Sequence, residues 1–171
     1  MRFFYSMAVL MLFYSCSENN KPVKEIIKAD TKWLDSIKNK SDTSWIKPYR
    51  NKDFAIAEYY VDRKDSIVTQ LMKDSAGTIR QINIAKYDMV RLFFAEYYAN
   101  GQSMGKLPLD SAGKYHGVAK FYYKNGVVKS SGLFRHGLYY GEWRNYDEKG
   151  KNISTDQYDS NGQLIKTIPA N

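Results

Sequence analysis

The sequence predicts an all-β protein: an elongated antiparallel β-meander built from double-hairpin repeats of about 24 residues, with one short amphipathic helix before it. Beyond residue 53, apolar and polar residues alternate with a period of two, as in strands that bury one face. Turn-forming tetrapeptides that end in glycine recur at nearly regular intervals. Aromatic residues make up 15% of the chain, and the 15 tyrosines favour strands.

Composition and charge limit the classes of protein to which the chain can belong. Its length of 171 residues favours one compact domain with a short extension. The formal net charge is +8, but lysine and arginine are dispersed, which favours a solvated basic surface over a nucleic-acid site. We therefore expect no nucleic-acid partner. The single cysteine excludes an intrachain disulfide and a metal cluster built from cysteines.

Residues 1–15 are predicted to be a signal peptide. Arg2 precedes an apolar run over residues 3–14, and Ser15 stands directly before Cys16. The run is too short to span a bilayer, which needs about 20 apolar residues, but it suits the core of a secretion signal. An ordinary cleaved signal with an incidental cysteine and an uncleaved anchor remain as alternatives.

The tetrapeptide Phe13-Tyr14-Ser15-Cys16 resembles the cleavage site of a bacterial lipoprotein signal. In that class the cysteine thiol is acylated and becomes the first mature residue, so the resemblance implies lipid attachment at Cys16. It also implies a protein of the Gram-negative cell envelope, held on the membrane by its lipid. Ser17 is not the Asp that marks inner-membrane retention in enterobacterial lipoproteins, so the outer membrane is the expected location.

Residues 16–50 are expected to contain a tether, the short helix and a linker. The polar residues after Cys16 predict a tether. From Val23 to Asn39 apolar residues recur at spacings of three and four, which predicts an amphipathic helix of about four turns. This helix either caps the sheet or lies on a lipid surface. Turn-forming residues over 40–53 indicate a linker into the main domain.

Residues 51–168 are predicted to form the β-hairpin repeat domain. Alternating segments predict its first strands, at 54–61, 66–72, 78–84 and 89–98. The glycines that close the successive turns follow at residues 77, 101, 113, 126, 137, 150 and 162. Asp, Asn or Ser opens each turn, and the closing glycine adopts the left-handed conformation that a bulged hairpin requires. Tight turns about 12 residues apart predict an antiparallel meander.

Two consecutive hairpins form one larger repeat. In the best-formed copy, the recurring positions that define the repeat are Gly132, Phe134, Gly137, Gly141, Trp143, Tyr146 and Gly150. This pattern resembles the variant MORN repeat, and residues 113–126 form a second copy with Ala119 in the position of the tryptophan. Variant MORN repeats occur in exported bacterial proteins and in proteins described as antitoxin-like. The resemblance therefore implies either a binding role in the envelope or neutralisation of a toxin by binding.

Reactive groups are sparse in this sequence. It contains no G-x-S-x-G nucleophile motif, no H-E-x-x-H zinc-binding motif and no complete phosphate-binding loop. We therefore predict no enzyme, no catalytic residue, no cofactor and no metal site. His116 and His136 each precede a glycine and are interpreted as turn residues. The alternative is a metal site in which the two histidines combine with the turn residues Asp110 and Asp147.

The remaining functional signal is aromatic. Paired rings, such as Tyr97 with Tyr98 and Tyr139 with Tyr140, place large side chains on both faces of one sheet. Either the helix covers one face, or a face serves as a recognition surface. We expect a non-catalytic binding module whose partner is another envelope protein or a toxin. An envelope enzyme acting on glycan or lipid through Glu58, Glu96 and Glu142 is the remaining alternative.

Overall fold

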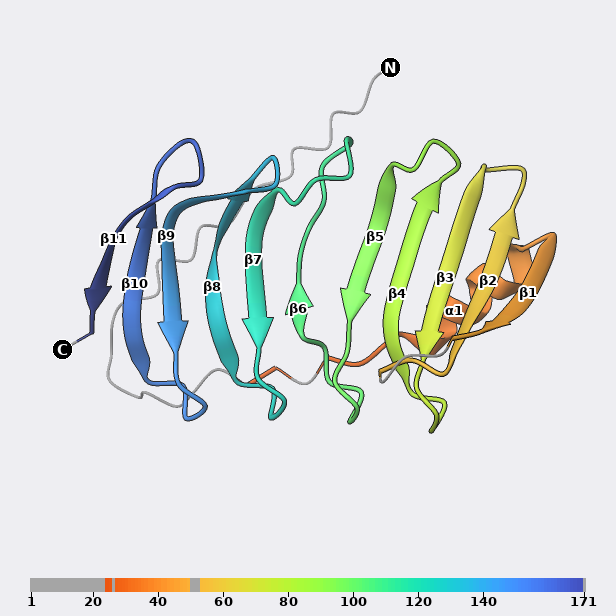
Figure 1. Ribbon diagram of the computed structural model, residues 1–171, viewed down its shortest axis with the longest axis horizontal. Helices are drawn as coiled ribbons and strands as arrows, with labels where there is room; N and C mark the ends of the chain where they lie inside the picture. The colour runs from red at the N-terminus through yellow and green to blue at the C-terminus, as the bar shows by residue number, and fades with distance from the viewer. Residues whose placement is uncertain (1–23, 26, 50–52, 171) are drawn as a thin grey trace, which may run out of the picture.

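The computed structural model describes residues 24–25, 27–49 and 53–170. The predicted signal peptide, the tether and Cys16 lie outside the described residues, so lipid attachment at Cys16 stays a prediction. Within the described ranges the fold is a long row of short strands with one helix, and the prediction of an all-β meander is confirmed (Figure 1).

The described strands form two antiparallel sheets, and each strand pairs with its neighbours in the sequence. The first sheet contains β1 (Thr43–Pro48), β2 (Ile56–Asp62), β3 (Ile67–Lys73), β4 (Ile79–Lys86) and β5 (Arg91–Glu96). The second sheet contains β6 (Gly105–Lys106), β7 (Gly117–Tyr122), β8 (Val128–Arg135), β9 (Leu138–Tyr146), β10 (Asn152–Tyr158) and β11 (Leu164–Pro169).

The sequence pattern had indicated one continuous sheet, and the structure divides it between β5 and β6. The segment that follows β5 is irregular: β6 has only two residues, and Pro108 just after it has no N–H to donate to a ladder. Single backbone bonds still cross the division. The Met104 N–H donates to the Glu96 carbonyl at 2.8 Å, and the Tyr122 N–H donates to the Met104 carbonyl at 3.0 Å.

The turns owe their shape to local side-chain hydrogen bonds. In each turn that Asp74, Asp110, Asp147 or Asp159 opens, the aspartate Oδ1 accepts from the backbone N–H groups two and four residues further on. The glycine that closes each of these turns has φ between +72° and +84°. This is the left-handed region that residues with a Cβ avoid, which explains why glycine recurs there.

Contacts between neighbouring turns explain the 24-residue repeat. Asn100 Nδ2 donates to the Lys124 carbonyl at 3.0 Å, and Asn125 Nδ2 donates to the Glu148 carbonyl at 3.1 Å. Two tyrosines repeat the arrangement: the Tyr98 and Tyr123 hydroxyls donate to the carbonyls of Tyr122 and Tyr146, at 2.9 and 2.8 Å. The recurring Tyr and Asn residues therefore link consecutive turns along one edge of the sheets.

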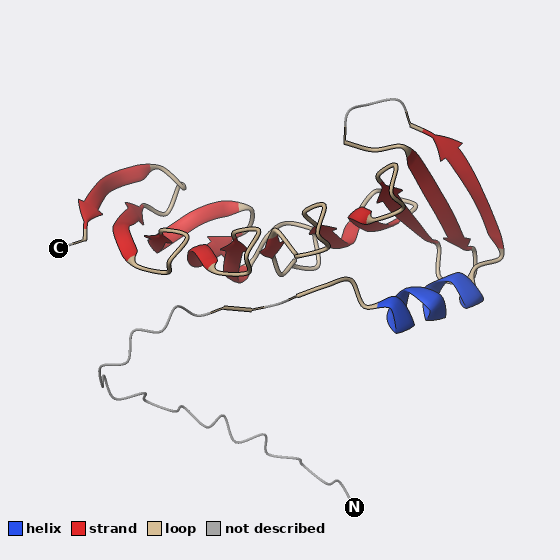
Figure 2. Ribbon diagram, turned by 90° about the horizontal axis from the view of Figure 1, so that it is seen from below, coloured by secondary structure: helices blue, strands red, loops and turns tan. Residues whose placement is uncertain are grey.

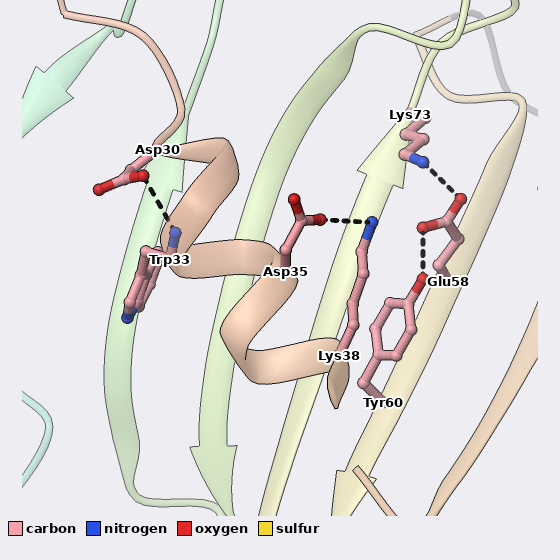
Figure 3. Close-up of polar contacts among 7 residues, drawn as sticks. All are labelled: Asp30, Trp33, Asp35, Lys38, Glu58, Tyr60 and Lys73. Atoms are coloured by element: carbon pink, nitrogen blue, oxygen red, sulfur yellow. Dashed lines mark hydrogen bonds and ion pairs between the residues drawn. The ribbon is translucent and has the colours of Figure 1, made fainter. Parts of the chain in front are cut away.

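The helix is shorter than predicted. α1 spans Thr31–Lys40, so the expectation that it begins at Val23 is wrong, whereas its end agrees with the prediction within one residue. Asp30 caps the N-terminus, because its side chain accepts a hydrogen bond from the Trp33 N–H at 3.0 Å (Figure 3).

α1 lies on one face of the first sheet, as the capping alternative had anticipated (Figure 2). Leu34, which is 3% exposed, packs there with Leu71 and Ile82. The Trp33 ring meets Phe93 edge to face, with centroids 4.9 Å apart. Burial of these apolar side chains is what holds the helix on the sheet.

The segment over 40–53, predicted as a linker, contains a strand instead. β1 pairs along its whole length with β2, from Thr43 opposite Val61 to Pro48 opposite Ile56. Proline is tolerated because β1 is an edge strand and one side of its backbone has no neighbour to bond. The turn-forming residues around Trp45 hid this strand from the sequence pattern.

Residues 24, 25 and 27, here called the N-terminal strap, run across the turns of both sheets. Lys24 forms a β-bridge with Val127, and the Glu25 N–H donates to the Gly126 carbonyl at 2.9 Å. The Ile27 carbonyl accepts from the Ser103 N–H at 2.7 Å. The strap thus joins the turn after β5 to the turn after β7, and it lies where helix had been expected.

Gln102 and Glu25 bind the strap through their side chains. Gln102, 3% exposed, accepts from the Ile27 N–H at 3.2 Å and donates to the Glu25 carbonyl at 3.1 Å. The Glu25 carboxylate accepts from Lys120 Nζ at 2.5 Å and from the Tyr122 hydroxyl at 2.8 Å. The Lys120 hydrogen bond, followed by that of Tyr122, lowers the pKa of Glu25 below its ordinary value of 4.5.

We expect the strap to make stability depend on acid pH. Because the folded-state pKa of Glu25 is lowered, its contribution is complete above the unfolded-state pKa near 4.5 and is lost as pH falls through the folded value. Glu25→Gln should therefore flatten the decline in unfolding free energy as pH falls below about 4.5. The difference should be about 1 kcal/mol, because the pair is partly exposed. Urea denaturation over this pH range measures it, with Glu148→Gln on an exposed turn as control; an unchanged pH profile would contradict this role.

Candidate functional site

Pairing between strands sorts the side chains of the first sheet onto two faces. The face under α1, the helix face, carries Leu71, Ile82 and Ala95 in one row. The opposite face, the distal face, carries the row Trp45, Tyr59, Gln70, Asn83 and Phe94. Successive strands contribute one residue each to this second row, so aromatic rings stand at its two ends and amides at its centre.

The distal row of the first sheet is held by its own contacts. The Trp45 and Tyr59 rings stack with centroids 5.0 Å apart and planes 9° apart, although Trp45 is 46% exposed. Gln70 Nε2 donates to the Tyr59 hydroxyl at 2.9 Å. The buried Oδ1 of Asn83 has no hydrogen-bond partner among the described residues. A row of stacked rings and amides can bind by stacking and by hydrogen bonds.

The second sheet carries an aromatic cluster on the same side of the molecule. Trp143, 3% exposed, lies over Gly132 and donates its indole N–H to the Leu133 carbonyl at 3.0 Å. The Phe134 and Tyr139 rings meet it edge to face, with centroids 5.0 and 4.6 Å from that of Trp143. Tyr139 is 39% exposed, so the cluster presents a ring to solvent above a buried base.

A set of hydrogen-bonded polar side chains, centred on Asp156, adjoins this cluster. Asp156 is paired with Trp143 on the neighbouring strand, and its Oδ2 accepts from Asn145 Nδ2 at 2.8 Å. Its Oδ1 accepts from the Thr167 hydroxyl at 2.6 Å, and Asn145 also donates to the Ser154 hydroxyl at 3.1 Å. Sequence reasoning missed this group. The alternation along β10, which puts Asp156 on the face of Tyr158, was the signal that could have located it.

A groove joins the distal faces of the two sheets. Its volume is about 370 Å³, and its lining includes Phe94, Glu96, Tyr98, Phe121, Ser130 and Tyr139. The first three belong to β5 and the turn after it, and the others belong to the second sheet. The distal row, the groove and the aromatic cluster therefore form one surface, here called the distal surface.

A second groove lies on the helix face at the division between the sheets. Its volume is about 640 Å³, and Ile27, Phe93, Leu107 and Val118 line it. The lining is mostly apolar, and Val118 is 67% exposed. Its polar lining side chains are Tyr97, Ser103 and Lys106, so this groove offers fewer hydrogen-bonding groups for selecting a partner than the distal surface does.

The three acids considered for catalysis do not come together. Glu58 lies on the helix face of β2, Glu96 lies at the distal groove on β5, and Glu142 is on β9 beside Gln157. Glu58 accepts hydrogen bonds from Lys73 and Tyr60, as Figure 3 shows. Burial acts to raise the pKa of Glu58, but these hydrogen bonds outweigh it and the pKa is lowered. A group held ionised in this way stabilises the fold and does not act readily as a general acid.

The two turn histidines do come together, with one of the aspartates considered. His136 Nδ1 lies 2.9 Å from Asp110 Oδ2, and the His116 and His136 ring centroids are 4.6 Å apart. The hydrogen bond with His136 lowers the pKa of Asp110, aided by the backbone N–H groups of Lys114 and Ala112. Asp147 lies in the turn between β9 and β10, at the opposite end of β9 from His136, and is not part of this group.

Comparison with known proteins adds no identification. No family model and no curated protein matches the chain. Among the described residues, no helix has the length and apolar character needed to cross a membrane.

Proposed function

We propose that the protein is a non-catalytic binding module of the cell envelope, anchored to the outer membrane through lipid on Cys16, whose distal surface contacts another envelope protein. The anchor rests on the resemblance of residues 13–16 to a lipoprotein signal. The binding role rests on one observation: exposed aromatic rings and hydrogen-bonding side chains share the distal surface. Such mixed surfaces are typical of specific protein contacts.

The chemistry of the distal surface favours binding over turnover. Hydrolysis of a glycan or lipid would need an acid and a base within reach of one bond. The distal surface instead offers Tyr139 as an exposed ring against Trp143. Asp156 is the cross-strand partner of Trp143, and its two carboxylate oxygens already accept hydrogen bonds. A preorganised ring next to fixed polar groups loses little conformational entropy when a partner binds.

Crosslinking in intact cells tests this proposal. We expect wild-type protein to capture one specific envelope partner, and Tyr139→Ala to lower the yield about tenfold because an exposed aromatic anchor is lost. Val118→Ala on the helix face is the matched control and should retain the partner. Cys16→Ser should move the protein out of the membrane fraction. The melting temperature of each variant shows whether a lost partner reflects lost folding.

The outcomes separate the alternatives. Capture of a toxin, with the same dependence on Tyr139, would assign the immunity or antitoxin-like role that the variant MORN resemblance implies. Absence of a specific partner, or equal yields from Tyr139→Ala and wild type, would refute the distal surface as the contact site. Retention of Cys16→Ser in the membrane fraction would refute the lipid anchor alone.

A further inference from the structure

The pairing of β7 with β8 brings together two histidines that are 20 residues apart. His116 directly precedes β7, His136 lies in the turn between β8 and β9, and Gly117 pairs with Phe134. The backbone N–H of His136 donates a hydrogen bond to His116 Nδ1 at 3.4 Å. Both imidazoles are exposed, so an ion in solution has direct access to them.

Asp110 supplies a third group from a separate loop. Its Oδ1 is occupied by the N–H groups of Ala112 and Lys114, which directs Oδ2 toward His136 Nδ1 at 2.9 Å. Asp74, Asp147 and Asp159 open turns with the same Oδ1 bonds. Of these four turn aspartates, Asp110 is the one that belongs to a group with two histidines.

The turn that carries His136 is rigid and does not depend on the imidazole. His136 and Gly137 have φ of +50° and +89°, the left-handed pair of a two-residue hairpin turn. The Gly137 N–H donates to the Tyr115 carbonyl at 2.7 Å, which fixes the turn against the loop of His116. Asparagine is the residue that such turns usually place before glycine, so the histidine contributes chemistry that the turn itself does not need.

The donor set suits a transition-metal ion. One ligand atom from each of Asp110, His116 and His136 lies within 4.8 Å of the other two. In a tetrahedral zinc site with bond lengths of about 2.0–2.2 Å, the ligand atoms lie about 3.3 Å from one another. Side-chain rotations that move these atoms by about 1 Å would bring them to that spacing. Two imidazoles and a carboxylate are typical ligands of zinc, and three protein ligands leave a fourth position free.

We propose that Asp110, His116 and His136 form a solvent-accessible site for one divalent transition-metal ion, with Zn²⁺ as the expected occupant. When the ion binds His136 Nδ1 in place of the hydrogen bond with Asp110 Oδ2, the proton of that bond passes to solvent. The site joins the loop before β7 to the turn after β8, and the fourth position accepts water or a ligand atom from a partner. The geometry thus favours the metal alternative over turn histidines without a ligand role.

Titration of the full chain in detergent with Zn²⁺ alone tests this site, with Cys16→Ser in every sample to remove the thiol. Isothermal titration calorimetry should give one equivalent bound, and His136→Asn and His116→Asn should each weaken binding at least tenfold. Asp147→Asn, in an equivalent turn without histidines, should bind like the parent. NMR signals of both imidazoles should shift with Zn²⁺.

His136→Asn preserves the turn, because asparagine forms the same left-handed pair with glycine. An unchanged melting temperature without metal would verify that this variant is folded. Absence of saturable Zn²⁺ binding, or binding that persists in the double variant His116→Asn/His136→Asn, would overturn the proposal. Its outcome is independent of the crosslinking result at Tyr139, since the two sites share no residue.

Discussion

Gly132→Ala should lower the free energy of unfolding by about 3 kcal/mol, a large effect for one added methyl group. A Cβ at residue 132 would lie 2.3–2.5 Å from three ring atoms of Trp143, far inside van der Waals contact. The indole cannot withdraw easily, because it is 3% exposed, packed by Phe134 and bonded to the Leu133 carbonyl. Urea denaturation followed by tryptophan fluorescence measures the change.

A double-mutant cycle isolates this contact. In a Trp143→Leu background the ring is absent, so Gly132→Ala should cost less than about 0.5 kcal/mol. Ser131→Ala, the neighbouring position on β8, controls for substitution in the strand itself. An equal cost of Gly132→Ala with and without the indole would show that the stacking of Trp143 on Gly132 is not the cause.

Gly113→Ala should destabilise the protein by about 3–4 kcal/mol, whereas Gly77→Ala should cost only about 1–2 kcal/mol. Both glycines close Asp-Ser-Ala-Gly turns with similar positive φ, +72° and +78°, so both substitutions carry the same backbone strain. They differ in their surroundings. A Cβ at residue 113 would lie 2.7 Å from the backbone N of Arg91, and a Cβ at residue 77 would meet nothing within 4 Å.

Chemical denaturation of both variants measures this difference directly. The obstructing atoms at residue 113 belong to the backbone of β5, which cannot rotate away as a side chain can. The clash therefore separates the loop before β7 from the first sheet, and the loss should appear as a lower transition midpoint. Equal midpoints for Gly113→Ala and Gly77→Ala would exclude this packing as a connection between the sheets.

The meander was predictable because its causes are local. An aspartate that bonds N–H groups two and four residues ahead, followed by a glycine, specifies a turn within five residues. The 24-residue repeat reflects contacts between neighbouring turns, such as that of Asn125 with Glu148. Because these contacts recur, the residues that make them recur in the sequence. The confirmed fold class rests on these short-range rules.

The errors have tertiary causes. The helix begins at Thr31 and not at Val23, because Glu25 and Ile27 use their backbones to bond turns about 75 to 100 residues away. A helical pattern of apolar residues cannot reveal such partners. β1 was missed because its edge position tolerates Pro48, which in a central strand would break the ladder.

The candidate sites also combine residues that local sequence patterns identify with residues that only the strand register brings together. Periodicity located the aromatic residues, but the partners of Asp156 come from the two strands on either side of β10 and appear only when their register is known. His116 and His136 are 20 residues apart and do not occupy equivalent positions of the 24-residue repeat, so comparison of the repeat copies does not pair them. The register of β7 with β8 places them side by side with Asp110.

The sequence by itself determined the turns, the strand period and therefore the order of the meander. The tertiary structure alone decided which face α1 covers, where the sheet divides, and which turns the strap and the histidine cluster join. The physical reason is the range of the interactions. Turn hydrogen bonds and side-chain alternation act within a few residues, whereas burial and strand register depend on chain segments far apart in the sequence.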